Sequence, residues 1–388
     1  MPSERDIRVC GPISEAERFA LDSDGFACVR VSDEPEIWRV ELLMERTFLP
    51  TVNVHVVRDG DDVLIVDTGT SDDYNDTRLM RALVRLGVDP TRATVFITHS
   101  HEDHAGLARE LADAGARILM SEQALADLRA FAAPEYRDFL AGRLASEGFA
   151  PDVARDLANT MWTTRSGSML DGVSVEVVRP GDRVRCGRWE FEVVGTPGHT
   201  PGHCVLWHPE LGIAFTGDAL LFACSTFICF WKDTPDALGL HLQSLHALAG
   251  LGIKQAYLGH GEQEGSIAER AEANIAHHER RSARAVKAIR EQPGRCACEL
   301  FRDLGWHAIG EGGLDAVPLL TRWFIAAESI ANLDHLVAIG SIRRVTDASG
   351  VARYYPEYRE MPGCPGKKQG GMYALFLAVR LRAERHPG

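Results

Sequence analysis

The chain has 388 residues, of which 45% are hydrophobic and 25% are charged, and its formal net charge is −13. This composition is typical of a globular protein of two or three domains, and it excludes collagen-like, low-complexity and disordered chains. No stretch approaches the roughly 18 uninterrupted apolar residues of a membrane-spanning helix, and the N-terminal segment lacks the apolar core of a secretory signal, so we expect a cytoplasmic protein.

The first two thirds of the sequence predict strands and helices in mixed order. Alternating runs rich in β-branched residues predict strands, and apolar residues three or four apart predict helices. Strands are predicted at 51–57, 63–66, 93–98, 116–120, 173–178, 189–194, 204–208, 213–216 and 256–258. Helices are predicted at 75–86, 105–114, 121–131 and about 235–249. An Asp-Gly-Asp-Asp sequence joins the first two strands as a hairpin, and a Pro-Gly-Asp turn joins 173–178 to 189–194.

Residues 133–168 interrupt this order with two or three predicted helices and no strand. The segment could be a lid over the site or a packing element, and the sequence favours neither. We take it as an insertion in a first domain that covers residues 1–265.

The remaining chain has a different character. Helices predicted at about 267–291, 298–304 and 319–339 precede strands at 341–345 and 351–355, an order that predicts a winged helix over 266–355. A tail at 356–388 contains a short apolar helix at 372–382, which could bury itself against its own domain or in a homodimer. From Arg270 onward there are 18 Lys/Arg against 13 Asp/Glu, a balance of +5 in an otherwise acidic chain. RNA therefore stays open as a partner.

The nine cysteines contain no Cys-x-x-Cys pair and are scattered, which predicts reduced thiols. Cys296 and Cys298 are too close together and too isolated to form a zinc knuckle.

A dense group of potential metal ligands follows the predicted strand at 93–98. His99, His101, Asp103 and His104 lie within six residues of one another. Imidazoles suit a borderline-soft ion such as Zn²⁺, and a carboxylate suits a second ion that prefers a harder ligand. The spacing therefore predicts a metal site at the end of this strand.

Five motifs resemble those of the metallo-β-lactamase superfamily. The run at 98–104 resembles the family's HxHxDH signature, and VDTG (66–69), GTPGHTPGH (195–203), FTGD (215–218) and LGHG (258–261) resemble the others in the same order. The resemblance covers about residues 50–265. It implies an α+β fold, a four-layer αββα sandwich followed here by the small winged-helix domain.

The family pattern implies a dinuclear metal centre with a bridging carboxylate. One ion would be held by His99, His101 and His199, the other by Asp103, His104 and His260, with Asp218 between them. Two zinc ions are expected, with iron or manganese as alternatives. Such ions lower the pKa of a bound water from 15.7 to roughly 7 and so supply hydroxide at neutral pH. Asp103 is the candidate catalytic residue, because it could accept a proton as well as bind metal.

Residues beside the ligands complete the predicted site. Asp67, Thr196 and Thr200 are candidates to fix the second nitrogens of the ligand imidazoles, and His203 is implied to be a structural neighbour. The apolar run at 222–231 could line a substrate pocket or pack in the core. We name Phe222, Trp231 and Lys232 as candidate substrate-binding residues.

The C-terminal segment resembles the winged-helix domain of a subset of this family, which includes a lactamase-like endoribonuclease and uncharacterised bacterial hydrolases. The favoured function is metal-dependent hydrolysis of an ester, thioester or lactone of a small molecule. An endoribonuclease or phosphodiesterase is one alternative. A mononuclear iron dioxygenase or a non-catalytic winged-helix binding protein is another.

Overall fold

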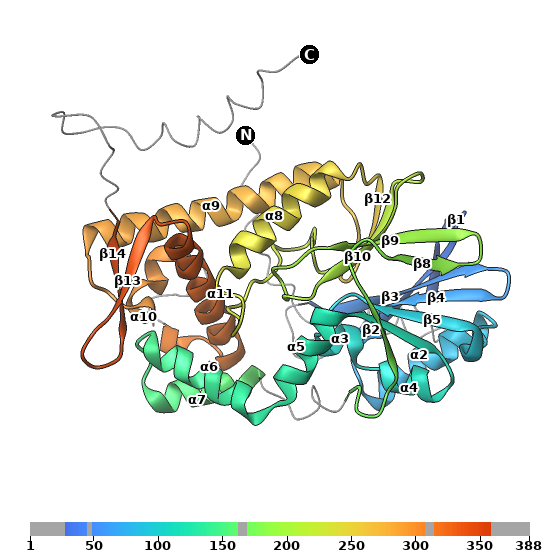
Figure 1. Cartoon of the computed structure of the whole chain (residues 1–388), viewed down its shortest axis with the longest axis horizontal. Coiled ribbons are helices and arrows are strands. Elements are labelled where there is room, and N and C mark those ends of the chain that lie inside the picture. The colour runs from blue at the N-terminus through green and yellow to red at the C-terminus, as the bar shows by residue number, and fades with distance from the viewer. Residues whose placement is uncertain (1–27, 45–48, 162–168, 307–313, 358–388) are drawn as a thin grey trace, which may run out of the picture. The chain divides into compact units, whose positions relative to one another are not determined.

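The computed structural model describes residues 28–44, 49–161, 169–306 and 314–357 (Figure 1). The predicted helix at 372–382 and the end of the predicted insertion, 162–168, lie outside these residues. The described part of the chain holds no helix that is both long and apolar enough to cross a membrane.

The first sheet has seven strands that lie side by side in chain order. They are β1 (Cys28–Asp33), β2 (Glu36–Leu43), β3 (Thr51–Asp59), β4 (Asp62–Val66), β5 (Ala93–Ile97), β6 (Arg117–Ser121) and β7 (Val175–Val178). The first four strands pair antiparallel, whereas β4 to β7 pair parallel. The middle strands are buried on both faces because the sheet is covered on both sides.

The second sheet has five strands in the order β12-β11-β10-β9-β8. These are β8 (Arg183–Cys186), β9 (Trp189–Gly195), β10 (Cys204–His208), β11 (Ile213–Gly217) and β12 (Gln255–Leu258). Neighbours pair antiparallel except β11 and β12, which are parallel.

Three apolar clusters show that the two sheets pack face to face between layers of helices. The inner cluster joins Phe96 of the first sheet to Phe191 and Phe215 of the second. A second cluster buries the outer face of the first sheet under α2 (Asp73–Arg85), α4 (Ala108–Asp113) and α5 (Glu122–Ala132). A third buries the outer face of the second sheet under α8 (Ala237–Gly250) and α9 (Ile267–Glu291). The predicted αββα sandwich is confirmed (Figure 1).

The prediction for the region of β7 to β9 was wrong in its pairing. The strands at 173–178 and 189–194 do not form a hairpin, because β7 belongs to the first sheet and β9 to the second. The short strand β8, which was not predicted, lies between them and pairs with β9. Strands β1 and β2 were also not predicted, and the helix predicted at 105–114 is two short helices, α3 (Glu102–Ala105) and α4.

A fourth apolar cluster lies in the helical part of the molecule. It contains side chains of α6 (Pro134–Ser146), α7 (Pro151–Met161), α10 (Ala297–Leu300), α11 (Leu319–Ala338), β13 (Ile342–Thr346) and β14 (Ala352–Pro356). The helices of the predicted insertion thus share a core with the C-terminal segment, and the described residues up to Pro356 form one compact unit. The predicted order of three helices and a hairpin is present. The winged-helix identity, the boundary at 265 and the lid remain predictions.

Candidate metal centre

The predicted metal ligands all follow strands that end at the same edge of the sandwich. His99 to His104 follow β5, His199 follows β9, Asp218 follows β11, and His260 follows β12. The strands concerned run in the same direction within each sheet, so their carboxyl ends coincide. Backbone hydrogen bonds of 2.9 Å from Cys204 N to Thr98 O and of 2.7 Å from Asn53 N to Gly259 O join the two sheets at this edge.

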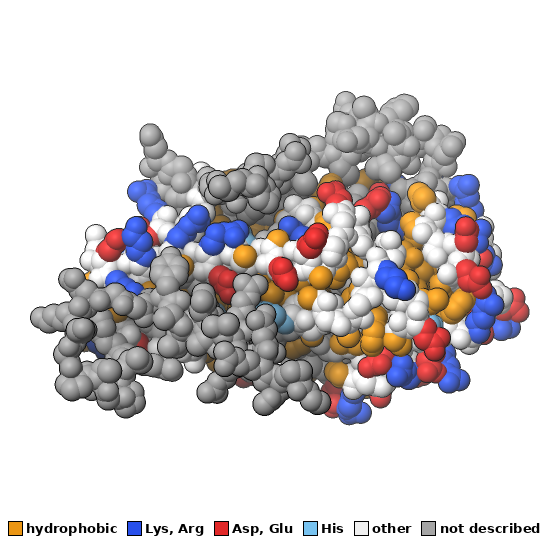
Figure 2. All heavy atoms as spheres, turned by 90° about the horizontal axis from the view of Figure 1, so that it is seen from above, with side chains coloured by type: hydrophobic (Ala, Val, Ile, Leu, Met, Phe, Trp, Pro, Cys, Tyr) orange, Lys and Arg blue, Asp and Glu red, His pale blue; other side chains and the backbone are white. Residues whose placement is uncertain are grey.

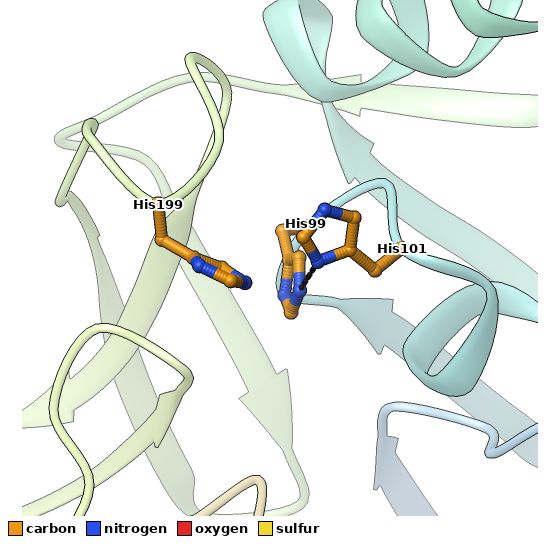
Figure 3. A group of neighbouring side chains, drawn as sticks. All are labelled: His99, His101 and His199. Carbon is orange, nitrogen blue, oxygen red and sulfur yellow. Dashed lines mark hydrogen bonds between the residues drawn. The ribbon is translucent and has the colours of Figure 1, made fainter. Parts of the chain in front are cut away.

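His99, His101 and His199 form the first group of potential ligands (Figure 3). His99 and His101 extend from the loop after β5, and His199 faces them from the loop after β9. The His99 Nε2 to His101 Nδ1 distance is 3.1 Å, and the rings of His101 and His199 meet edge to face with centroids 4.6 Å apart.

Asp103, His104 and His260 form a second group, and Asp218 lies between the two. His260 Nε2 is 3.3 Å from His104 Nε2 and 3.2 Å from Asp103 Oδ2. Asp218 Oδ2 is 3.4 Å from His260 Nε2 and 3.7 Å from His199 Nε2, and its Oδ1 is 3.5 Å from His104 Nε2. All seven predicted ligands are thus brought together, with Asp218 in the position of a bridge.

The charges differ between the two groups in the metal-free chain. Burial and neighbouring imidazoles lower the pKa of His101 to about 3, and burial likewise lowers the pKa of His99 and His199, which stay neutral. Burial also opposes a charge on His260, but Asp218 and Asp103 outweigh it and raise the pKa of His260 to about 10. The same two carboxylates raise the pKa of His104. Protons therefore occupy the carboxylate-rich half when metal is absent.

The donor set and its spacing fit divalent metal ions. Four ligands around a tetrahedral zinc ion lie roughly 3.4 Å from one another, and the ligand atoms here are separated by 3.2 to 3.7 Å at most of the measured contacts. Within the described part of the chain, the buried atoms His199 Nε2 and Asp218 Oδ1 make no hydrogen bond. Buried polar atoms need a partner, and a cation between these groups would satisfy both.

The second nitrogen is held in four of the five potential ligand imidazoles, His99, His104, His199 and His260, mostly by groups that the sequence did not indicate. Asp67, one of the three candidates for this role, has its Oδ2 2.8 Å from His104 Nδ1. The other partners are Thr98 Oγ1 for His99 (3.0 Å), the Phe227 carbonyl for His199 (2.7 Å) and the Thr51 carbonyl for His260 (2.6 Å). Two of these acceptors are backbone oxygens, which leave no residue-type signal. Thr98 had a signal, since it directly precedes His99.

Thr196 and Thr200 do not hold a ligand imidazole. Thr196 Oγ1 lies 2.8 Å from Nδ1 of His203, and the Asp218 backbone N–H donates to His203 Nε2 at 3.2 Å. Because Nε2 accepts, Nδ1 carries the proton and donates to Thr196. Both nitrogens of His203 therefore make hydrogen bonds within the protein. The His203 ring stacks on the His99 ring, with the ring centroids 4.9 Å apart. The buried Thr200 hydroxyl makes no hydrogen bond among the described residues.

The three candidate substrate-binding residues lie in different surroundings. The Trp231 ring lies 6.4 Å from that of His101, nearly parallel to it, and is packed in the helical cluster. Phe222 packs instead with the cluster outside the second sheet, under the Arg270 guanidinium. Lys232 is exposed. Of the three, Trp231 has a measured contact with a potential ligand.

Comparison with known proteins identifies the sandwich. The model of the Metallo-beta-lactamase superfamily matches residues 49–260, which is more than half of the chain. A hydroxyacylglutathione hydrolase from Cereibacter sphaeroides is 27% identical over 207 residues, 52% of this chain and 62% of that relative. The chain therefore spans less than two thirds of this relative's length. An uncharacterized protein from Mycobacterium leprae is 30% identical over 174 residues, 43% of this chain and 67% of its own.

Two solved structures are similar over a longer stretch. A metallo-beta-lactamase family protein from Thermus thermophilus has a TM-score of 0.65 and 26% identity, and the match covers 82% of this chain and 98% of that one. A beta-lactamase domain protein from Burkholderia ambifaria has a TM-score of 0.69 with 24% identity, covering 85% and 94%. The latter is a likeness of fold alone. In both, the matched part is larger than residues 49–260.

Proposed function

Because the chain belongs to the metallo-beta-lactamase superfamily, whose members include metal-dependent hydrolases, we propose that it is a dinuclear metal-dependent hydrolase of small-molecule thioesters or esters. The observation that carries the proposal is the pair of ligand groups that share Asp218 within one buried volume. Zinc is the favoured ion for a donor set of five imidazoles and two carboxylates.

Divalent ions in this centre would polarise the scissile carbonyl and acidify the attacking water. The residues of the chain supply the rest. Asp67 fixes the proton of His104 on Nδ1 and so directs the Nε2 lone pair to the centre. His203 holds the Asp218 backbone in place.

Asp103 is the proposed proton acceptor. Burial acts to raise the pKa of the Asp103 carboxyl, but His104 and His260 have the larger effect and lower it below its usual value. The group is therefore ionised at neutral pH. Its side chain keeps 20% of its surface exposed, more than the 7% of Asp218. Asp103 is thus the more accessible of the two carboxylates to a substrate or a water molecule.

The thioester preference rests on the relatives that are named for hydrolysis of hydroxyacylglutathione, which is a thioester. Their names support an acyl-transfer substrate over a phosphodiester. On the face shown in Figure 2, Lys/Arg and Asp/Glu side chains are interspersed over the described residues. A nucleic-acid site would favour a basic area of one sign.

The test is a substrate panel with the zinc-loaded chain. We expect turnover of acyl thioesters or esters, loss of turnover after chelation, and two ions per chain by elemental analysis. His260→Ala should lose turnover and one ion. His246→Ala is the matched control, because His246 is exposed on α8 and bonds its own helix backbone. Cleavage of RNA with no cleavage of any ester or thioester would overturn the proposal, as would a single iron per chain.

A further inference from the structure

Two cysteines in the C-terminal segment lie in contact, far along the chain from the metal ligands. Cys296 precedes α10 and Cys298 is within it. Their sulfur atoms are 3.2 Å apart. The seven described cysteines are all free thiols, and the metal centre uses none of them.

We propose that Cys296 and Cys298 are a redox-active dithiol that hydroperoxides oxidise to an intrachain disulfide. A disulfide needs a sulfur separation of about 2.05 Å, so the two sulfurs must approach by little more than 1 Å. Rotation of the two side chains about χ1 moves their sulfur atoms by distances of this order.

The two thiols differ in reactivity. The Cys298 thiol lies 3.2 Å from two possible acceptors, the Cys296 sulfur and the Gly148 carbonyl, and the backbone N–H of Glu299 donates to the Cys296 sulfur. These hydrogen bonds outweigh burial and lower the pKa of Cys296, whereas the pKa of Cys298 is raised. Since the thiolate is the nucleophile and the Glu299 backbone N–H stabilises a charge on the Cys296 sulfur, Cys296 is the attacking residue and Cys298 the resolving one.

The reaction balances with a hydroperoxide, ROOH, as the oxidant. The Cys296 thiolate attacks the peroxide oxygen, so that an S–O bond forms, the O–O bond breaks and ROH leaves after taking up a proton. Cys298 sulfur then attacks the sulfenic acid, forms the S–S bond and releases water made from the sulfenic hydroxyl and a proton. Two thiols and ROOH become one disulfide, ROH and water.

The surroundings leave room for this reaction. Cys298 is partly exposed and its sulfur lies 3.2 Å from that of the buried Cys296, so a small peroxide would approach Cys296 past Cys298. Gly148, in a left-handed conformation with φ +97°, lies against both sulfurs. A Cβ there would be 2.5 Å from Cys296 Sγ and 2.8 Å from Cys298 Sγ, so any other residue would occupy the space that the sulfurs use.

Other cysteines provide the contrast. Burial raises the pKa of Cys204 to about 11 and of Cys186 to about 12. Unlike Cys296, neither of these thiols has its pKa affected by a second cysteine. Low thiolate content makes such groups slow to react.

The oxidation state of both cysteines can be measured in a single tryptic peptide. Trypsin cuts after Arg295 and Arg302 and releases CACELFR, which contains both cysteines. The full-length chain is treated with hydrogen peroxide, alkylated with iodoacetamide, digested and analysed by mass spectrometry. We expect this peptide to appear unalkylated and about 2 Da lighter than its dithiol form, and to become alkylated when dithiothreitol precedes the iodoacetamide.

Two variants and a control separate the steps. Cys298→Ser should stop at the sulfenic acid, which dimedone traps on Cys296. Cys296→Ser should leave Cys298 alkylatable. Cys28→Ser, which removes a partly exposed thiol elsewhere, should form the disulfide as the unaltered chain does. The proposal is overturned if Cys296 and Cys298 both stay alkylatable in the peroxide-treated chain, or if dimedone labels Cys298 in the Cys296→Ser chain. No readout depends on hydrolysis, so the result is independent of the proposed function.

Discussion

The sharpest test of the metal centre is Asp67→Asn, which changes the tautomer of a ligand without changing its position. Asp67 follows β4 with a φ of 62°. Its Oδ1 accepts from the Thr98 backbone N–H at 2.8 Å, and its Oδ2 accepts from the Thr98 hydroxyl at 2.9 Å and from His104 Nδ1 at 2.8 Å. A carboxylate only accepts hydrogen bonds, so Nδ1 carries a proton and Nε2 is left for the metal.

Asparagine has the same shape as aspartate, but one of the two acceptor oxygens is replaced by an amide NH₂ group, which donates hydrogen bonds. Its carbonyl is expected to keep the bond to the buried Thr98 backbone N–H, because an unsatisfied buried donor costs about 1–3 kcal/mol. Its amide nitrogen then faces His104 Nδ1 and donates to it, which moves the imidazole proton to Nε2. Losing such a partner lowers metal affinity by about 10- to 100-fold, or roughly 1.4–2.7 kcal/mol.

The loss should be larger for the ion that His104 would hold. Asp67 pairs with His104 directly but reaches His99 only through the Thr98 hydroxyl, so a zinc titration against a chromophoric chelator should show one ion weakened more than the other. Asp61→Asn is the control, since Asp61 is 80% exposed in the turn between β3 and β4. Wild-type affinity for both ions in a folded Asp67→Asn chain would refute the tautomer argument, and so would equal weakening of both.

Three further predictions concern packing, buried charge and protons. Gly259→Ala places a Cβ 2.4 Å from Asp218 Oδ1, so elemental analysis should find a folded chain that has lost metal, and full occupancy would contradict the geometry. Glu147→Ala removes a fully buried carboxylate that pairs with two arginines and accepts a hydrogen bond from a tyrosine. Urea unfolding should show that the free energy of unfolding falls by about 3 kcal/mol. A decrease below about 1 kcal/mol would count against a buried ionic network. Zinc binding at pH 7 should release protons, because the pKa values of His104 and His260 are raised in the metal-free chain. The affinity for zinc should therefore rise with pH. Calorimetry in two buffers of different ionisation enthalpy measures the protons released, and a release of none would contradict this prediction.

The strands missed in the sequence differ from those predicted in how much of each is buried. Strand β2, EIWRVELL, buries Ile37, Val40 and Leu42 among partly buried positions, so its apolar alternation is interrupted at Trp38 and Arg39. Strand β8 has four residues, two of them exposed arginines. Short, half-exposed strands at a sheet edge carry little of the apolar alternation on which such predictions depend. The pairing error at 173–194 has the same origin, since β8 separates two strands of different sheets.

The grouping of the seven potential ligands was predictable because each lies in a short motif after a strand, where local sequence and position in the fold coincide. Their supporting contacts were not. The carbonyls of Phe227 and Thr51 hold His199 and His260 across 28 and 209 residues of chain. Every residue carries a backbone carbonyl, so only the fold determines which carbonyl reaches the imidazole.

The apolar run at 222–231 shows why substrate residues were the hardest to predict. The sequence left a choice between pocket and core, but the run takes part in both the core and the metal centre. Phe227 stacks edge-on against Phe324 of α11 with centroids 4.6 Å apart, while its carbonyl accepts from His199. Phe230 packs against Trp323 of the same helix. Helix α11 therefore packs against the run whose Phe227 carbonyl holds the potential ligand His199. Substitutions of Phe324 should thus change metal affinity through the Phe227 carbonyl, although Phe324 itself is not a potential ligand.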